Sequence, residues 1–205
     1  MSKKKVKFIV AGKDDNLYFI NSYKRNEKQA IRLKDNLVKM GVNRTNIKII
    51  YGYDLTKPEI WKKKHPKLNK QKLVFHNFFD FILPEMLKSG KNAYYLEDHT
   101  VVYDNPDKYP KDNKLVWLGF MKRLKDYIVG AHLVYLDKDL IKELDRDKAK
   151  YRPAYIDRFF KNLAEKKGYL QIDKSITKII EHFSLALGKV RKNPKNKYFF
   201  KPDLV

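Results

Sequence analysis

The chain has no cysteine among its 205 residues. Disulfide bonds, thiolate metal ligands and a cysteine nucleophile are therefore excluded. No apolar stretch is long enough to cross a bilayer, so no membrane-spanning helix is expected. The first apolar stretch, residues 6–11, is shorter than the core of a secretory signal peptide, and we expect a cytoplasmic protein.

Acidic residues are few compared with basic ones. The sequence has 24 Asp and Glu against 46 Lys and Arg, a formal net charge of +22. Such an excess favours a polyanionic partner, which could be nucleic acid, an anionic membrane or an acidic polysaccharide. The excess is nearly all lysine in a chain that is also rich in Asn, Ile, Tyr and Phe. An AT-rich genome is therefore an alternative source of the charge.

The length and composition are those of one folded domain. Hydrophobic residues make up 43% of the chain and aromatic residues 14%, which is enough to build a core. No repeat or linker divides the sequence. We therefore predict a single domain over residues 1–205, with a basic tail from about residue 189.

Segments with strand-like and helix-like hydrophobic patterns alternate, which predicts an α/β fold. Strands are expected at residues 5–11, 17–20, 47–51, 93–96, 115–119, 127–136 and 169–172. Helices are expected at residues 30–40, 75–86, 140–144, 153–163 and 175–183, with Pro84 interrupting the second. Gly41 should end the first helix, and Asp137 or Asp139 should cap the third. Residues 57–72 are expected to form a basic connecting loop.

An acidic motif, Glu97-Asp98-His99, follows the apolar run at residues 93–96. Strand ends in α/β folds are where ligands bind. Two carboxylates and an imidazole at such a position can hold a divalent cation and a diphosphate. The alternative is a solvated turn after a strand.

Several short motifs occur in a fixed order along residues 17–185. They are Ile20-Asn21, the basic segment Lys24 to Arg32, His76 near a helix start, Glu97-Asp98-His99, Trp117-Leu118-Gly119, the segment Gly130 to Leu136, and Asp157. This ordered set resembles glycosyltransferase family 25, the lipopolysaccharide-biosynthesis type. One position departs from the family pattern, because His99 stands where the family has its last acid.

The resemblance implies a GT-A-like domain with a Rossmann-like mixed sheet flanked by helices. It also implies a nucleotide-sugar donor, UDP-linked, bound near four residues: Asn21, Arg32, Glu97 and Asp98. Asp98 or His99 would ligate Mn²⁺ or Mg²⁺ if a cation is used, although histidine brings no negative charge. Asp98 and Asp157 are the catalytic candidates, with Asp157 as the base for the acceptor hydroxyl.

Each of these residues also has a structural alternative. Arg32 could be a solvated helix residue, and Asp157 an acid favoured by the dipole at a helix start. His132 lies in a predicted strand, where a structural histidine is the simpler interpretation. The sequence leaves both possibilities open for His76.

Basic residues gather in three places that could contact a phosphate backbone. They are Trp61, Lys62, Lys63 and Lys64; Lys122 and Arg123; and Arg191, Lys192, Lys195 and Lys197. Lysine and arginine supply affinity for phosphates, and aromatic rings such as Trp61 stack on bases. We therefore hypothesise transfer to a hydroxymethylated base in DNA, as viruses use, which would place the protein in the host cytoplasm.

Two alternatives to this hypothesis remain open. One is a glycan- or lipopolysaccharide-directed transferase that lies on an anionic membrane surface. The other is a degenerate, non-catalytic GT-A domain that binds nucleic acid, for which the missing third acid is the motivation. For the segment around Trp61, the alternative to a polyanion-binding loop is a solvated loop.

Overall fold

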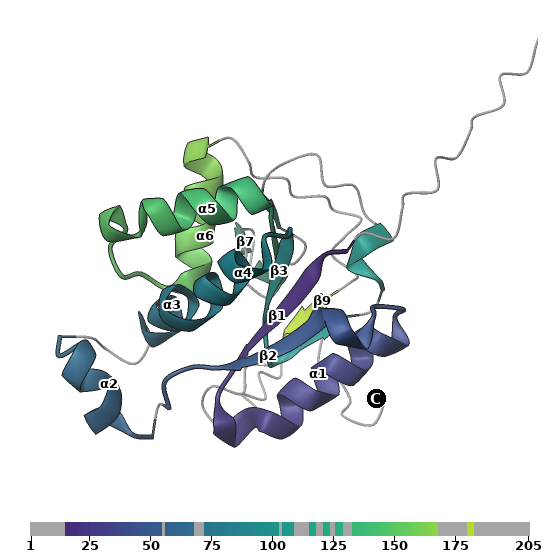
Figure 1. The fold of residues 1–205 in the computed structure, drawn as a ribbon, viewed down its shortest axis with the longest axis horizontal. Helices are drawn as coiled ribbons and strands as arrows, with labels where there is room; N and C mark the ends of the chain where they lie inside the picture. Colours follow the sequence, from purple (N-terminus) through teal and green to yellow (C-terminus); the bar gives the residue numbers. More distant parts are fainter. Residues whose placement is uncertain are drawn as a thin grey trace, which may run out of the picture.

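The computed structural model describes most of the chain. The described residues are 15–54, 56–67, 72–102, 104–108, 115–117, 121–123, 126–128, 133–167 and 180–182. The predicted strands at residues 5–11 and 169–172 lie outside these ranges. Both helices and strands occur along the described ranges, which makes this a mixed α/β fold as expected (Figure 1).

A mixed sheet of five strands forms the centre of the described structure. Its strands are β1 (Leu17–Ser22), β2 (Ile47–Tyr51), β3 (Ala93–Glu97), β5 (Leu115–Trp117) and β8 (Leu133–Leu136). They lie in the order β2-β1-β3-β8-β5. β1 runs parallel to both β2 and β3, whereas β8 is antiparallel to β3 and β5. The carboxyl ends of the three parallel strands therefore share one edge.

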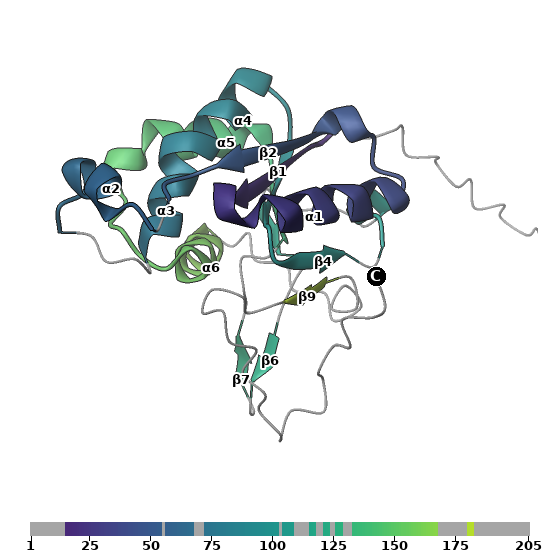
Figure 2. The same ribbon diagram turned by 90° about the horizontal axis from the view of Figure 1, so that it is seen from below.

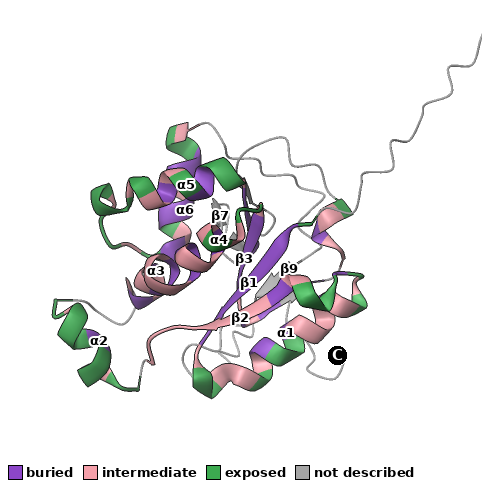
Figure 3. Cartoon of the chain, viewed as in Figure 1, coloured by how far each residue is buried: buried purple, intermediate pink, exposed green. Residues whose placement is uncertain are grey.

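Helices cover both faces of this sheet (Figure 2). One face packs against α1 (Glu27–Lys39). The opposite face packs against α3 (Leu73–Asn77), α4 (Leu83–Ser89), α5 (Lys138–Arg146) and α6 (Ile156–Lys167). All six residues of β1 are buried, as expected for a strand with both faces covered (Figure 3).

Local sequence signals explain how two of these helices begin and end. Ala30, Leu33 and Leu37 form the buried stripe of α1. Gly41 follows α1 with a φ of 94°, and the N–H groups of Gly41 and Val42 donate to the carbonyls of Val38 and Leu37. This is a Schellman ending, which glycine permits without steric cost. Asp137 caps α5 by accepting from the N–H of Asp139.

The segment between α3 and α4 is a π-helical turn, η4 (Phe78–Ile82). Pro84 follows it in the first turn of α4. Because proline has no N–H, it cannot continue the regular hydrogen-bond ladder, and the predicted interruption at Pro84 is confirmed. α6 begins at Ile156, so Pro153 precedes the helix and does not lie in its first turn.

Two small sheets lie beside the main one. β4 (Thr100–Val102) pairs with β9 (Ile180–His182), and β6 (Met121–Arg123) pairs with β7 (Asp126–Ile128). The helix expected over residues 175–183 is therefore wrong at β9, because pairing with β4 overrides the local helical spacing. The strand expected at residues 127–136 is two strands, β7 and β8, and residues 129–132 are outside the described ranges.

The connection expected as a loop at residues 57–72 contains a helix, α2 (Pro58–Lys64). Pro58 occupies the first turn, where its fixed φ suits a helix, and Lys62, Lys63 and Lys64 lie at the favourable carboxyl end. Trp61 is buried, with 1% of its surface exposed. Burial of this ring stabilises a short helix that local preference alone would not maintain.

Short 3-10 turns complete the described elements. They are η1 (Lys24–Asn26), η2 (Arg44–Asn46), η5 (Pro106–Lys108) and η6 (Lys148–Lys150). In η2 the side chain of Asn43 accepts from the N–H of Thr45, which satisfies one donor at the start of the turn.

Gly52 lies where the end of β2 passes Asn77, and a methyl group there has no room. A Cβ built at Gly52 would lie 2.3 Å from Asn77 Cγ, and Asn77 is fully buried. We therefore expect Gly52→Ala to destabilise the protein by about 1–3 kcal/mol in urea unfolding. In an Asn77→Ala background the same change should cost much less. Equal costs in both backgrounds would contradict this account.

Candidate functional site

The carboxyl ends of β1 and β3 lie at a topological switch point. From β1 the chain passes through α1 to β2, and from β2 it returns over the opposite face to β3 on the other side of β1. The two connections leave in opposite directions, and ligands of open α/β sheets bind at such positions. Asn21 is the register partner of Glu97, so the predicted motif and the end of β1 are neighbours.

Asp98 is held firmly between these two strands. Its N–H donates to the carbonyl of Asn21 at 3.1 Å. The hydroxyl of Ser22 donates to Asp98 Oδ2 at 2.8 Å. The residue is only 5% exposed. A carboxylate so buried requires partners for its charge, and the end of β1 supplies one of them.

His99 lies between the two carboxylates of the motif. Its Nδ1 is 3.2 Å from Asp98 Oδ1, and its Nε2 is 3.0 Å from Glu97 Oε2. Burial alone would lower the pKa of His99, but the charges and hydrogen bonds of Glu97 and Asp98 raise it to about 9. The ring is therefore an imidazolium at neutral pH, and it is the positive charge of this site.

The arrangement of these three residues does not fit a divalent cation. Both nitrogens of His99 face carboxylates as donors, whereas a ligating histidine must offer a free lone pair. Both oxygens of Asp98 already accept hydrogen bonds. The imidazolium occupies the space between the carboxylates that a Mn²⁺ or Mg²⁺ ion would need, so we assign no chemical step to a cation here.

Buried polar atoms without partners surround this motif. Within the described residues, Asn21 Oδ1, the Tyr23 hydroxyl and Asn77 Nδ2 are buried and make no well-formed hydrogen bond, although Tyr23 lies beside Asn77. Burial, Glu97 and Asp98 raise the pKa of Tyr23, which keeps its hydroxyl protonated. Buried polar atoms are normally paired, so this group at a switch point is typical of a binding site for a polar ligand.

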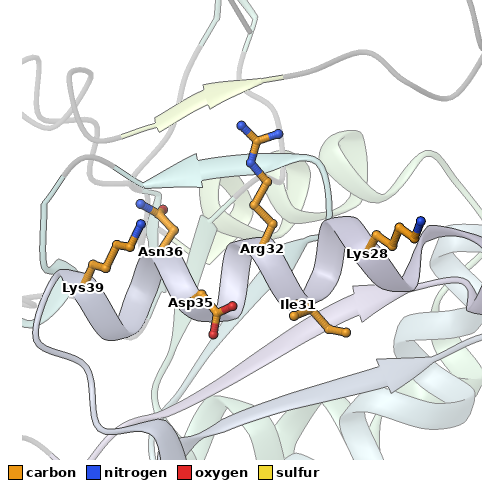
Figure 4. Close-up of a pocket in the computed structure, with 6 residues that line it drawn as sticks. All are labelled: Lys28, Ile31, Arg32, Asp35, Asn36 and Lys39. Carbon is orange, nitrogen blue, oxygen red and sulfur yellow. The ribbon is translucent and has the colours of Figure 1, made fainter. Parts of the chain in front are cut away.

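The other two predicted chemical residues, Arg32 and Asp157, lie on helices that cover opposite faces of the sheet. Arg32 is exposed on α1, where it extends from the helix and lines a hollow of about 300 Å³ (Figure 4). Asp157 lies in the first turn of α6, a helix that contacts α3, and its carboxylate accepts from the N–H of Arg158.

A second cluster, His65-His76-Asp80, was not expected as a unit. His65 follows α2, His76 lies in α3 and Asp80 in η4. The two imidazole rings are 3.8 Å apart between centroids, and His65 Nε2 is 3.0 Å from Asp80 Oδ2. Burial and the neighbouring His65 lower the pKa of His76 to about 4. The spacing of four residues between His76 and Asp80 places both on one side of a helix and could have been noticed in the sequence. No sequence pattern linked these two residues to His65.

Only some of the predicted nucleic-acid contacts lie within the described ranges. Trp61 is buried, so its interpretation as an exposed stacking anchor is wrong, whereas Lys62 and Lys63 are exposed at the end of α2. Lys64 is paired with Asp80 at 3.2 Å. Lys122 and Arg123 lie in β6, where only the backbone is described. Four residues lie outside the described ranges, as does His132: Arg191, Lys192, Lys195 and Lys197.

Comparison with known proteins adds no family to these observations. No protein-family model matches the sequence, and no curated protein matches it. Separately, none of the helices in the described ranges has the length and apolar character that crossing a lipid bilayer requires.

Proposed function

We propose that the chain is a glycosyltransferase of the GT-A type, which moves a sugar from a UDP-linked donor to a hydroxyl group. The observation that carries this proposal is the group of residues at the switch point between β1 and β3. It combines the carboxylates of Glu97 and Asp98 with the imidazolium of His99 and with the buried polar side chains of Asn21, Tyr23 and Asn77. The sheet order and the helices on both faces agree with a Rossmann-like nucleotide-binding domain.

The chemistry of transfer explains why these groups are useful. A bond forms between the acceptor oxygen and the anomeric carbon while the bond from that carbon to the diphosphate breaks. The diphosphate leaves with the electron pair, so negative charge develops on it. His99 is paired on both nitrogens with the carboxylates of Glu97 and Asp98, so the charge on the leaving diphosphate must be balanced by a basic side chain outside the motif. Asn21 Oδ1 offers an acceptor to the polar part of the sugar nucleotide, and Tyr23, beside Asn77, offers a hydroxyl.

The acceptor hydroxyl must lose its proton to a carboxylate during an inverting transfer. Asp157 is the proposed base, on the family resemblance and on its half-buried position in the first turn of α6. Arg32 is the proposed phosphate contact from α1, where it is exposed and carries no ion pair in the described structure.

We further propose that the acceptor is a hydroxymethylated base in DNA. The net charge of +22 supports this choice, together with the exposed Lys62 and Lys63 at the end of α2. Contacts between lysine and phosphate give affinity that falls steeply as salt rises. A base inside a duplex must be flipped out before transfer, so single-stranded DNA should be the better acceptor.

The test is a transfer assay with labelled UDP-sugars. We expect label in the nucleosides of hydroxymethylated DNA and none in unmodified DNA of the same sequence, with binding weakened as salt rises. Label in lipid-linked oligosaccharide but not in DNA would refute the proposal that DNA is the acceptor. A separate measurement tests the donor, because a ligand at 100 times its Kd should stabilise the protein by about 2.7 kcal/mol. If no sugar nucleotide raises the thermal stability, the proposed transferase activity is refuted and a non-catalytic binding domain is favoured.

A further inference from the structure

The His65-His76-Asp80 cluster has the composition and geometry of a metal site. One ligand atom from each residue lies within 4.8 Å of the other two. All three side chains are partly buried. His76 and Asp80 are four residues apart on one helical face, which the π-helical turn η4 crosses. Turns of this kind are frequently found at functional sites.

Contacts outside the cluster hold these three residues in place. The N–H of His65 donates to the carbonyl of Trp61 at 2.9 Å, and Trp61 is buried. The hydroxyl of Tyr53 donates to Asp80 Oδ2 at 2.7 Å, while the N–H of Tyr53 donates to Asn77 Oδ1 at 2.9 Å. The fold therefore pays the cost of assembling the cluster before any ion binds, and Tyr53 is a positioning residue for Asp80.

The ligand types select a class of ion. Two imidazoles and one carboxylate suit zinc and its transition-metal neighbours, whereas Mg²⁺ and Ca²⁺ prefer oxygen ligands. Ligand atoms on a tetrahedral zinc ion lie roughly 3.4 Å apart, given bonds of about 2.0–2.1 Å. The three ligand atoms lie within 4.8 Å of one another, and His65 Nε2 and Asp80 Oδ2 are hydrogen-bonded at 3.0 Å, so a binding ion must replace the proton between them.

An open hollow borders the cluster at His65. His65 also lines a cavity of about 510 Å³ whose other walls are Pro66, Lys67, Lys72, Arg152 and Pro153. Three protein ligands with an accessible fourth position are typical of zinc sites that keep a bound water. Asp80 supplies the only negative charge of the cluster. A divalent ion bound by it and by two neutral imidazoles would therefore keep a positive charge, which an anionic fourth ligand could neutralise.

Lys64 is the group that competes with an ion. Its Nζ lies 3.2 Å from Asp80 Oδ2, and its side chain is 60% exposed. A cluster built only for an ion pair would lose stability without Lys64 and would bind no metal. A metal site would instead gain affinity, because the competing cation is gone. This difference separates the two interpretations experimentally.

We propose that His65, His76 and Asp80 bind one divalent ion of the zinc class, with one coordination position left for water. This site is distinct from the Glu97-Asp98-His99 motif and does not depend on the proposed transfer activity. It uses different ligands, from α3, η4 and the end of α2.

The test is a titration of the full-length, chelator-stripped protein with Zn²⁺ against a chromophoric chelator, and with Co²⁺ by visible absorption. We expect one Zn²⁺ per chain, and no Mg²⁺ binding at the same concentrations. His76→Gln and Asp80→Asn should each weaken Zn²⁺ binding by at least about 100-fold, and Tyr53→Phe by about 10-fold. Lys64→Gln should tighten it. His182→Gln, in β9, is the matched control and should bind as the parent does.

Two results would overturn the site. One is the absence of stoichiometric Zn²⁺ binding by the parent protein. The other is an unchanged Zn²⁺ affinity in the His76→Gln and Asp80→Asn variants, provided that urea unfolding without metal shows both variants to be folded. In one form of this result, Zn²⁺ binding is lost only in a His99→Gln variant. The last outcome would place the ion at the ends of β1 and β3 instead.

Discussion

Asp98→Asn is expected to abolish sugar transfer, with a loss of at least about 10²–10³-fold in kcat. The carboxylate accepts from the Ser22 hydroxyl at one oxygen and from the His99 imidazolium at the other. Asparagine keeps the shape but carries no charge, and its NH₂ group can only donate, so either the Ser22 hydroxyl turns to accept or the bond to His99 is lost. His99 then loses one of the two charges that keep it protonated and fix its orientation in the site.

The same change should lower stability, because Asp98 is buried and the imidazolium of His99 loses one of its two charged partners. We expect a loss of about 1–3 kcal/mol in urea unfolding. Asp145→Asn makes the same chemical change at a surface pair with Lys148, and we expect its cost to stay within about 0.5 kcal/mol with transfer unchanged. Full transfer activity in a folded Asp98→Asn variant would return the motif to a structural turn. If Asp98→Asn lowers stability but the parent protein transfers no sugar, the hydrogen bonds of Asp98 are supported and only the proposed enzyme activity is refuted.

Stability is expected to fall between about pH 6.5 and pH 9 as His99 loses its proton. The folded-state pKa is raised from the usual 6.5 to about 9 by Glu97 and Asp98, which outweigh burial. A raised pKa gives stability that is fully present below the unfolded pKa and is lost as pH rises through the folded pKa. The difference corresponds to about 3 kcal/mol, and His99 is 20% exposed, so solvent screening reduces it little.

The measurement is urea unfolding from pH 6 to pH 9.5 for the parent protein and for His99→Gln. Glutamine cannot carry the charge, so the His99→Gln profile should lack the decline that His99 causes. The difference between the two profiles removes contributions from other titrating groups. Glu97→Gln should move the decline to lower pH, because one of the two carboxylates that hold the proton is gone. Parallel profiles for parent and His99→Gln would refute the charged state of this ring.

Much of the secondary structure could be predicted from the sequence because its signals are local. The stripe of Ala30, Leu33 and Leu37 indicated α1, and Gly41 marked its end. Pro84 indicated a break, and the break is the turn η4. The predictions that failed concern segments whose structure depends on distant partners. β9 is a strand because it pairs with β4, and α2 is a helix with a buried Trp61, which no local periodicity shows.

The sequence by itself determined that this is an α/β protein and that Glu97, Asp98 and His99 follow a strand, because periodicity, caps and strand ends depend on neighbouring residues. Only the tertiary structure decided that this strand lies beside β1 and that His99 stands between two carboxylates. It also brought His65 to His76 and Asp80. These facts depend on the sheet order and on helix packing, which join residues far apart in the chain through contacts that no short sequence window contains.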